Sequence, residues 1–326
     1  MIKIIKRQWF LLSLVLAFVA VIFDPSNILA TIGIILKNHH STEVMIFLIF
    51  IFSGLLIEMD QITAGIKDIQ STVLALVVII VLAPISAGVL CLFPIETGVA
   101  IGLFIVAVMP TTLSSGIVMT GIAGGNMAHA LFVTILSNFI GIFTIPVILS
   151  ILLSFFNQET QLVIDQTAII AKLILLVLFP LMIGIIARDR VFKTNQLAKF
   201  KLQMLNQWMI IGVVFISLSG AKQVLLGKGG TAIFYIVILV SAFHLILLGC
   251  SFLLVKFFRV EKGRCESIIF MGSQKTLALS VMIQVTYFNE FGTALLVCVS
   301  HHIVHLMMDG YLSTKMNQRL LEKNRY

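Results

Sequence analysis

Two polar clusters interrupt apolar stretches of the chain and hold the residues best suited to chemistry. The first begins at Pro110, which removes a backbone donor and breaks a helix, and continues with Thr111, Thr112, Ser114 and Ser115. The second comprises Gln274, Lys275 and Thr276. Freed carbonyls, hydroxyls and an amide can bind a cation or the polar groups of a substrate. Taken alone, the first cluster also fits a plain proline kink.

Lys275 is the most informative single residue. A lysine in the middle of a membrane is costly and by default marks a functional site with a partner. Counting from the inner end of its apolar segment at about 1.5 Å per residue places Lys275 about 13 Å deep, which is too far for its ammonium group to reach the surface. We therefore expect Lys275 to serve function rather than packing.

A polar face follows the first cluster. Thr134, Ser137 and Asn138 are spaced i, i+3, i+4 and share one side of a helix. Their oxygens could complete a cation cage. Hydrogen bonds between neighbouring helices are an equally good interpretation.

The last apolar segment carries a further polar stripe. His302, His305 and Asp309 fall at i, i+3, i+7. Asp309 is a candidate counter-ion for Lys275, and histidines beside it could relay protons. A packed polar seam is the simpler alternative. The isolated His129 and His244 are interpreted as structural.

These residues need membrane-spanning helices to position them. Hydrophobic residues make up 60% of 326 positions and charged residues 11%, against about 25% charged in soluble domains. A span needs about 20 apolar residues, and apolar runs of this length recur from end to end of the chain. We therefore expect residues 1–326 to form one all-α membrane domain. The segment 28–36 is too short to cross and is expected at the outer interface. The ten candidate spans are 8–23, 43–58, 72–92, 98–120, 127–154, 168–187, 207–224, 231–255, 266–287 and 292–314.

The charge distribution orients these spans. With both termini in the cytoplasm, 17 of the 22 basic residues lie on the inner side, as the positive-inside rule requires. The net charge of +8 is thus spread over short loops and does not indicate a nucleic-acid partner. The four cysteines show neither disulfide nor zinc spacing. We expect a multi-pass protein of the inner or plasma membrane.

Ten spans divide into two inverted five-helix repeats, about 1–157 and 165–326. Inverted repeats with broken helices at mid-membrane are characteristic of secondary transporters. The two polar clusters occupy helices four and nine, which are equivalent in such an arrangement.

Several motifs together resemble the bile acid:sodium symporter superfamily, and most closely its SBF-like branch. The resemblance covers nearly the whole chain and includes the segments Ser53 to Leu56, Pro110 to Thr112, Gly124 to Asn126, Thr134 to Asn138 with Gly141 and Pro146, and Gly272 to Leu277. It implies a panel domain (helices one, two, six and seven), a core domain of the other six, and a site where broken helices four and nine cross.

The resemblance also implies sodium ligands at Ser114, Ser115, Thr134 and Gln274. Three positions depart from the family pattern: an acidic ligand is replaced by Phe270, a glutamine by Ile79 and an asparagine by Lys275. The ammonium of Lys275 could stand in for a bound cation or pair with a substrate anion.

The expected function is secondary active transport of a small organic anion by alternating access, coupled to sodium or protons. The alternatives are a proton-coupled exchanger and a channel or ion-homeostasis protein without sodium symport. An intramembrane enzyme is disfavoured because the chain lacks H-E-x-x-H and G-x-S-x-G motifs. The expected partners are the anion and the lipid bilayer, with no cofactor beyond sodium. Substrate identity, direction and oligomeric state are left open.

Overall fold

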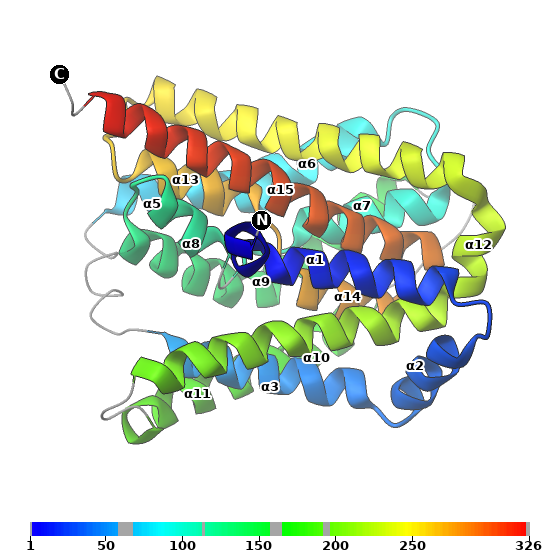
Figure 1. Ribbon diagram of the computed structural model, residues 1–326. Helices are drawn as coiled ribbons and strands as arrows, with labels where there is room; N and C mark the ends of the chain where they lie inside the picture. Colours follow the sequence, from blue (N-terminus) through cyan, green and yellow to red (C-terminus); the bar gives the residue numbers. More distant parts are fainter. Residues whose placement is uncertain (1, 58–67, 113–114, 157–164, 192–195, 324–326) are drawn as a thin grey trace. The chain divides into compact units, whose positions relative to one another are not determined.

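The computed structural model describes residues 2–57, 68–112, 115–156, 165–191 and 196–323, and within these ranges all regular secondary structure is helical, with no strands (Figure 1). The first half contains α1 (Ile2–Phe23), α2 (Ile28–Asn38), α3 (Ser41–Leu56), α5 (Ile69–Val77), η1 (Val78–Leu82), α6 (Ala83–Leu90), α7 (Thr97–Val108), α8 (Ser115–Ile122) and α9 (Met127–Phe156). The second half contains α10 (Gln166–Leu173), η2 (Ile174–Leu178), α11 (Phe179–Val191), α12 (Gln196–Phe257), α13 (Cys265–Ser273), α14 (Leu277–Tyr287) and α15 (Gly292–Lys323).

Seven helical stretches of the described chain are long and apolar enough to cross a membrane. The pair Leu12–Phe23 and Ile28–Asn38, bent by 108°, gives an eighth candidate. The helices α3 and α7 are apolar but shorter. Every predicted span overlaps a helix, and the chain is therefore an all-helical, multi-pass membrane protein. Ten complete spans in inverted repeats stay a prediction.

The predicted spans 207–224 and 231–255 both have counterparts, the membrane-capable stretches Lys201–Gln223 and Thr231–Phe257. The structure differs from the expectation in that both stretches belong to one helix, α12, of 62 residues, with no loop between them. The predicted loop of α12 contains Gly227, Gly229 and Gly230, and each costs about 1 kcal/mol in a helix, so local propensity opposes the helical continuity found there. The predicted interfacial segment 28–36 forms the helix α2, of 11 residues, and its place at the interface stays a prediction.

The described chain divides into two compact units, each assembled from three segments. Unit 1 contains residues 1–57, 165–236 and 277–299, and unit 2 contains residues 58–164, 237–276 and 300–326. Both units draw on both halves of the sequence, so they do not coincide with the predicted repeats. Unit 1 includes the four helices expected in a panel domain, together with residues 277–299.

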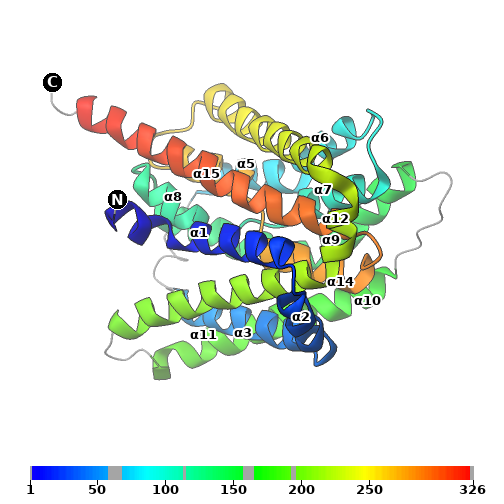
Figure 2. The same cartoon turned by 45° about the vertical axis from the view of Figure 1, so that its right-hand side comes forward.

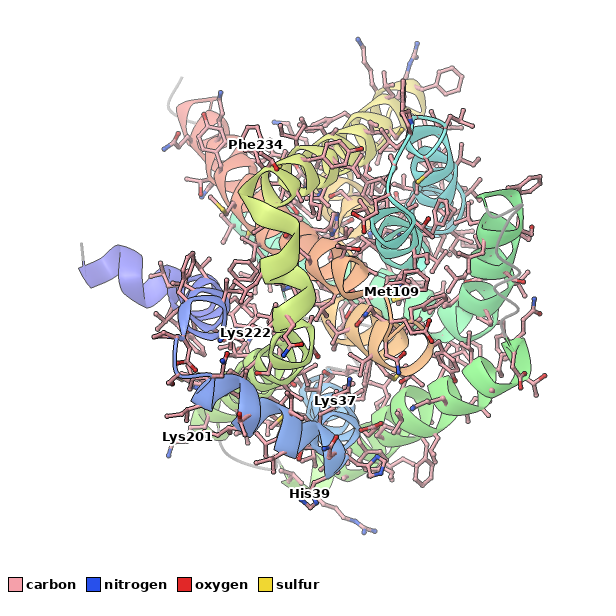
Figure 3. All side chains as sticks on the ribbon, turned by 90° about the vertical axis from the view of Figure 1, so that its right-hand side faces the viewer. Lys37, His39, Met109, Lys201, Lys222 and Phe234 are labelled. Carbon is pink, nitrogen blue, oxygen red and sulfur yellow. The ribbon has the colours of Figure 1, made fainter. Side chains whose placement is uncertain are left out.

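Unit 1 is held together by close packing of α3 against α11. Glycines make this approach possible: a Cβ atom on Gly54 would collide with the Leu181 carbonyl oxygen, and one on Gly184 with the Ile51 carbonyl oxygen. Lys222 of α12, labelled in Figure 3, ties the turn after α1 to this unit by donating to the Asp24 carbonyl oxygen at 2.6 Å and to Asn27 Oδ1 at 2.7 Å.

Unit 2 is built around α13, which packs against α5, α8 and α9. All residues from Glu266 to Ser273 are buried. The later part of α15 runs beside the later part of α12 in both views (Figures 1 and 2), and a hydrogen bond between His244 and Asp309 joins them. Unit 2 therefore brings both predicted polar clusters and the polar stripe of α15 into one body.

Candidate functional site

The helical breaks predicted at the two polar clusters are both present in unit 2. The helix α7 ends at Val108, and the backbone is extended at Met109 (labelled in Figure 3) before α8 begins at Ser115. The helix α13 ends at Ser273, and Gln274 is extended. The backbone amide of Thr276 donates to the Pro110 carbonyl oxygen at 3.0 Å, so the two breaks are joined directly by their main chains.

Gln274 connects the hydroxyls of one break to a buried carboxylate. Its Oε1 accepts from Thr112 Oγ1 at 2.9 Å and from Ser115 Oγ at 2.8 Å. Its Nε2 donates to Asp309 Oδ2 at 2.8 Å. The Thr112 hydroxyl oxygen also accepts from the Gly116 amide at 3.1 Å, which fixes it at the start of α8. Three oxygens thus converge on one side of the amide, and the carboxyl group of Asp309 lies on the other.

Asp309 is paired with histidine rather than with lysine. Its Oδ1 lies 3.0 Å from His244 Nε2 on α12, while His305 Nδ1 is 4.0 Å from Oδ2. His305 Nε2 in turn lies 2.8 Å from His302 Nδ1. These groups are fully buried or nearly so. They form a polar chain along α12 and α15 that is interrupted between Asp309 and His305, where the 4.0 Å contact is longer than a hydrogen bond.

Lys275 makes a different set of contacts from the expected ion pair with Asp309. Its Nζ donates to the carbonyl oxygens of Ile79 at 2.9 Å and of Ala107 and Met109 at 3.0 Å each. The residue is 2% exposed. Among the described residues, no carboxylate lies within ion-pairing distance of this ammonium. Asp309 is held instead by His244 and Gln274.

The predicted polar face of α9 bonds largely to its own helix. Thr134 Oγ1 donates to the Ala130 carbonyl oxygen at 2.8 Å, and Ser137 Oγ donates to the Thr134 carbonyl oxygen at 3.0 Å. Asn138 reaches across to the first break, with its Nδ2 3.4 Å from the Thr111 carbonyl oxygen. The buried side-chain oxygens of Thr111 and Asn138 have no hydrogen-bond partner, so they remain available as acceptors. Ser114 lies outside the described residues.

Two residues interpreted as structural from the sequence behave differently from each other. His129 bridges Thr72 at 3.2 Å and Ser267 at 2.5 Å, in keeping with a structural role. His244 instead contacts Asp309 and belongs to the polar chain. The sequence signal was present, because His244 is a titratable residue inside a predicted span, but its partner lies 65 positions away.

With this geometry in place, similarity to known proteins becomes informative. The model of the SBF-like CPA transporter family matches residues 8–318. The chain belongs to this family. It is therefore a transporter of the bile acid:sodium symporter type in the SBF-like branch, and this assignment favours transport over an intramembrane enzyme.

Individual members of the family are distant relatives. The chain is 29% identical over 298 residues to the "Probable sodium/metabolite cotransporter BASS4, chloroplastic" of Arabidopsis thaliana, covering 86% of this chain and 67% of that protein. It is 24% identical over 332 residues to the protein of the same name from Oryza sativa subsp. indica, covering 94% and 75% respectively. It is also 29% identical over 189 residues to the "Sodium/bile acid cotransporter 7-B" of Xenopus laevis, covering 56% and 53% respectively.

Proposed function

We propose that this SBF-like transporter moves a small organic anion across the membrane by alternating access, driven by a sodium or proton gradient. The observation that carries the proposal is the junction of two interrupted helices around the buried ammonium of Lys275. Secondary transporters place their sites near mid-membrane on discontinuous helices, where unwound backbone and helix ends contact substrate and coupling ion.

The positive charge of Lys275 favours an anion as the transported molecule. A buried cation raises the electrostatic potential of the surrounding site, and this potential attracts anions most strongly where water is excluded. The name of one relative supports the same chemical class, since it is called a sodium/bile acid cotransporter and a bile acid is an organic anion.

Sodium coupling is supported by the oxygens beside Gln274. Hard cations bind oxygen ligands from side chains and carbonyls. Thr112 Oγ1, Ser115 Oγ and Gln274 Oε1 lie within 2.9 Å of one another, and Thr111 and Asn138 contribute buried oxygens with unused lone pairs. Thr134, and Ser114 outside the described residues, complete the set of proposed sodium ligands.

A second candidate is proton-coupled transport or exchange. The observation in its favour is the buried carboxylate of Asp309 in contact with His244, continued by His305 and His302. Histidine changes charge near physiological pH, and buried chains of carboxylate and histidine serve as proton relays in membrane transporters.

The ion that couples to transport can be identified before the substrate is known. The purified protein is unfolded thermally in sodium, potassium and choline chloride at equal ionic strength and at several pH values. An ion that binds only the folded state raises its stability by mass action. A saturable, sodium-specific rise in Tm supports symport with sodium, whereas no sodium effect together with pH-dependent stability supports the proton mechanism.

Uptake into proteoliposomes then tests transport itself. Cholate and a panel of small mono- and dicarboxylates serve as probes, under an inward sodium gradient, an inward proton gradient or neither. We expect accumulation of at least one anion above its equilibrium level under one of the gradients. Equilibration without accumulation for every permeant probe would indicate a channel and contradict the proposal.

A further inference from the structure

The contacts of the Lys275 ammonium group match its bonding capacity. An ammonium group has three N–H donors and no acceptor. Three carbonyl oxygens, of Ile79, Ala107 and Met109, receive these donors at 2.9, 3.0 and 3.0 Å. The lysine therefore ends in a complete set of neutral oxygen ligands, which we call the carbonyl cage.

The carbonyl cage uses oxygens that their own helices leave without partners. Ala107 lies in the last turn of α7, where the carbonyl groups have no amide four residues ahead and carry the partial negative charge of the helix end. Met109 follows that end with an extended backbone, so its carbonyl oxygen lies outside the hydrogen-bond pattern of the helix. Ile79 lies in the π-helical stretch η1, where the Ala83 amide donates to the Val78 carbonyl oxygen. The corresponding donor for the Ile79 carbonyl would be residue 84, a proline without an amide hydrogen.

The cage also supplies the electrostatic compensation for the lysine. A buried charge without a compensating partner is strongly destabilising, and within the described residues no carboxylate contacts Lys275. Rings of backbone carbonyls are the chemistry by which proteins replace the hydration shell of a monovalent cation. The three carbonyls come from the end of α7, from Met109 just after it, and from η1. The same oxygens can bind a free monovalent cation, because this chemistry does not require the cation to be part of a side chain.

We propose that the carbonyl cage is a monovalent-cation site and that the Lys275 ammonium occupies it as a tethered ion. Shortening the side chain opens the site to a free cation. Ammonium and its primary alkyl derivatives fit best, because they reproduce the N–H donors at the same distances. The carbonyl cage does not depend on which anion is transported. Backbone carbonyls, rather than direct pairing with the substrate, compensate the charge of Lys275.

Chemical rescue of Lys275→Ala tests the proposal. The substitution removes three carbons and the nitrogen, which together have the size of n-propylammonium. Thermal unfolding of the detergent-purified variant is followed against ammonium, methylammonium and n-propylammonium chloride, with choline chloride at equal ionic strength. We expect a Tm at least ~5 °C below the unsubstituted protein. A saturable recovery of half or more of that loss is expected, largest for n-propylammonium and absent for choline.

Two controls separate the cage from general effects of amines. In Lys275→Met, methionine fills the space of the lysine side chain but carries no charge. This variant should be less stable than the unsubstituted protein, and alkylammonium ions should not raise its Tm. Lys222→Ala removes another buried lysine, in unit 1. If the recovery of Tm depends on the carbonyl cage, n-propylammonium should raise the Tm of this variant no more than methylammonium does. Equal responses of all three variants would overturn the proposal.

The proposal remains testable if the alanine variant does not fold. Lys275→Gln offers the cage two N–H donors and no charge, so its Tm should fall by ~3 °C or more. A Tm equal to that of the unsubstituted protein, or a folded alanine variant indifferent to alkylammonium ions, would overturn the cage. Because these readouts need no substrate, failure of the anion-transport proposal would appear separately, in the uptake measurements.

Discussion

At the scale of single residues, the orientation of the Gln274 amide links the parts of the site in unit 2. A carboxylate can only accept hydrogen bonds, so the amide nitrogen must face Asp309 and the amide oxygen must face Thr112 and Ser115. Hydrogen bonds to a charged acceptor are roughly twice as strong as neutral ones. The hydrogen bond to Asp309 therefore keeps the oxygen of Gln274 turned toward the hydroxyls.

We predict that Gln274→Leu destabilises the protein by ~3 kcal/mol. Leucine has a similar volume but leaves an oxygen of buried Asp309 and two hydroxyls without this partner. The matched control is Gln284→Leu, because Gln284 is also buried and donates to the neutral carbonyls of Phe288 and Phe291 at 3.0 and 3.1 Å. For this control we expect the free energy of unfolding to fall by ~1 kcal/mol. Thermal unfolding of both variants checks the difference, and equal losses would contradict it.

At the scale of helices, unit 1 depends on the close approach of α3 and α11. Gly54 and Gly184 face each other's backbones, and small residues at such crossings let membrane helices pack by van der Waals contact. No rotamer change can relieve a clash with backbone atoms, so this crossing tolerates no side chain at either position.

Gly184→Ala should therefore lower Tm by several degrees, because the added methyl group forces α3 and α11 apart. Gly249→Ala on α12 provides the matched control, since a Cβ atom there meets nothing within 4 Å. We expect that variant to be unchanged or more stable by up to ~1 kcal/mol, because alanine favours the helix over glycine. Parallel thermal unfolding of the two variants measures the contrast; a stable Gly184→Ala protein would show that the crossing can relax.

The start of α5 in unit 2 is fixed by a charged cap. Asp68 Oδ1 accepts from the Ser71 amide at 3.2 Å, and Oδ2 lies 2.8 Å from Arg264 Nε. Partial burial favours the neutral carboxyl, but the hydrogen bonds from Ser71 and the charge of Arg264 outweigh it, so the pKa of Asp68 is lowered from its ordinary value. The ionised carboxylate therefore stabilises the fold at neutral pH.

Asp68→Asn keeps a capping side chain but removes the charge. Because the folded-state pKa of Asp68 is lowered, its contribution is present above the unfolded pKa of about 3.9 and is lost as pH falls through the folded value. We expect the variant to lose ~0.5–1 kcal/mol at pH 7, and the difference in Tm between the two proteins to shrink below about pH 4. Unfolding curves between pH 3 and 7 measure this; a difference that grows on acidification would contradict the assignment.

At the scale of the whole molecule, the distribution of basic residues defines an orientation in the bilayer. We propose that both termini face the cytoplasm, in the inner or plasma membrane, since most Lys and Arg residues then lie on the inner side. The Arabidopsis relative carries "chloroplastic" in its name.

Cysteine labelling tests this orientation. In a background lacking Cys91, Cys250, Cys265 and Cys298, a membrane-impermeant maleimide should label Asn38→Cys in right-side-out vesicles and Lys262→Cys only in inverted vesicles. Both positions are exposed, so access depends on the side of the membrane. The reverse pattern would invert the topology, and labelling of both variants in the same vesicles would contradict the predicted number of crossings between them.

The sequence alone determined the helical membrane class, the apolar segments and the two breaks. These are local properties, since a span is a run of apolar residues and a proline interrupts the helix in which it stands. The continuity of α12 was missed because the glycines between its two apolar runs favour a loop. The sequence also marked Ile79 and Lys275 as departures from the family pattern without indicating that they touch.

Only the tertiary structure decided the partners of the buried charges. Lys275 contacts the carbonyl of Ile79, 196 positions away, and Asp309 contacts His244 rather than the lysine. The composition of the chain indicates which side chains need partners, but every residue carries the same carbonyl group. Which carbonyls are freed by a helix end or a π-helical stretch, and which of them meet a lysine, is set by how the helices pack.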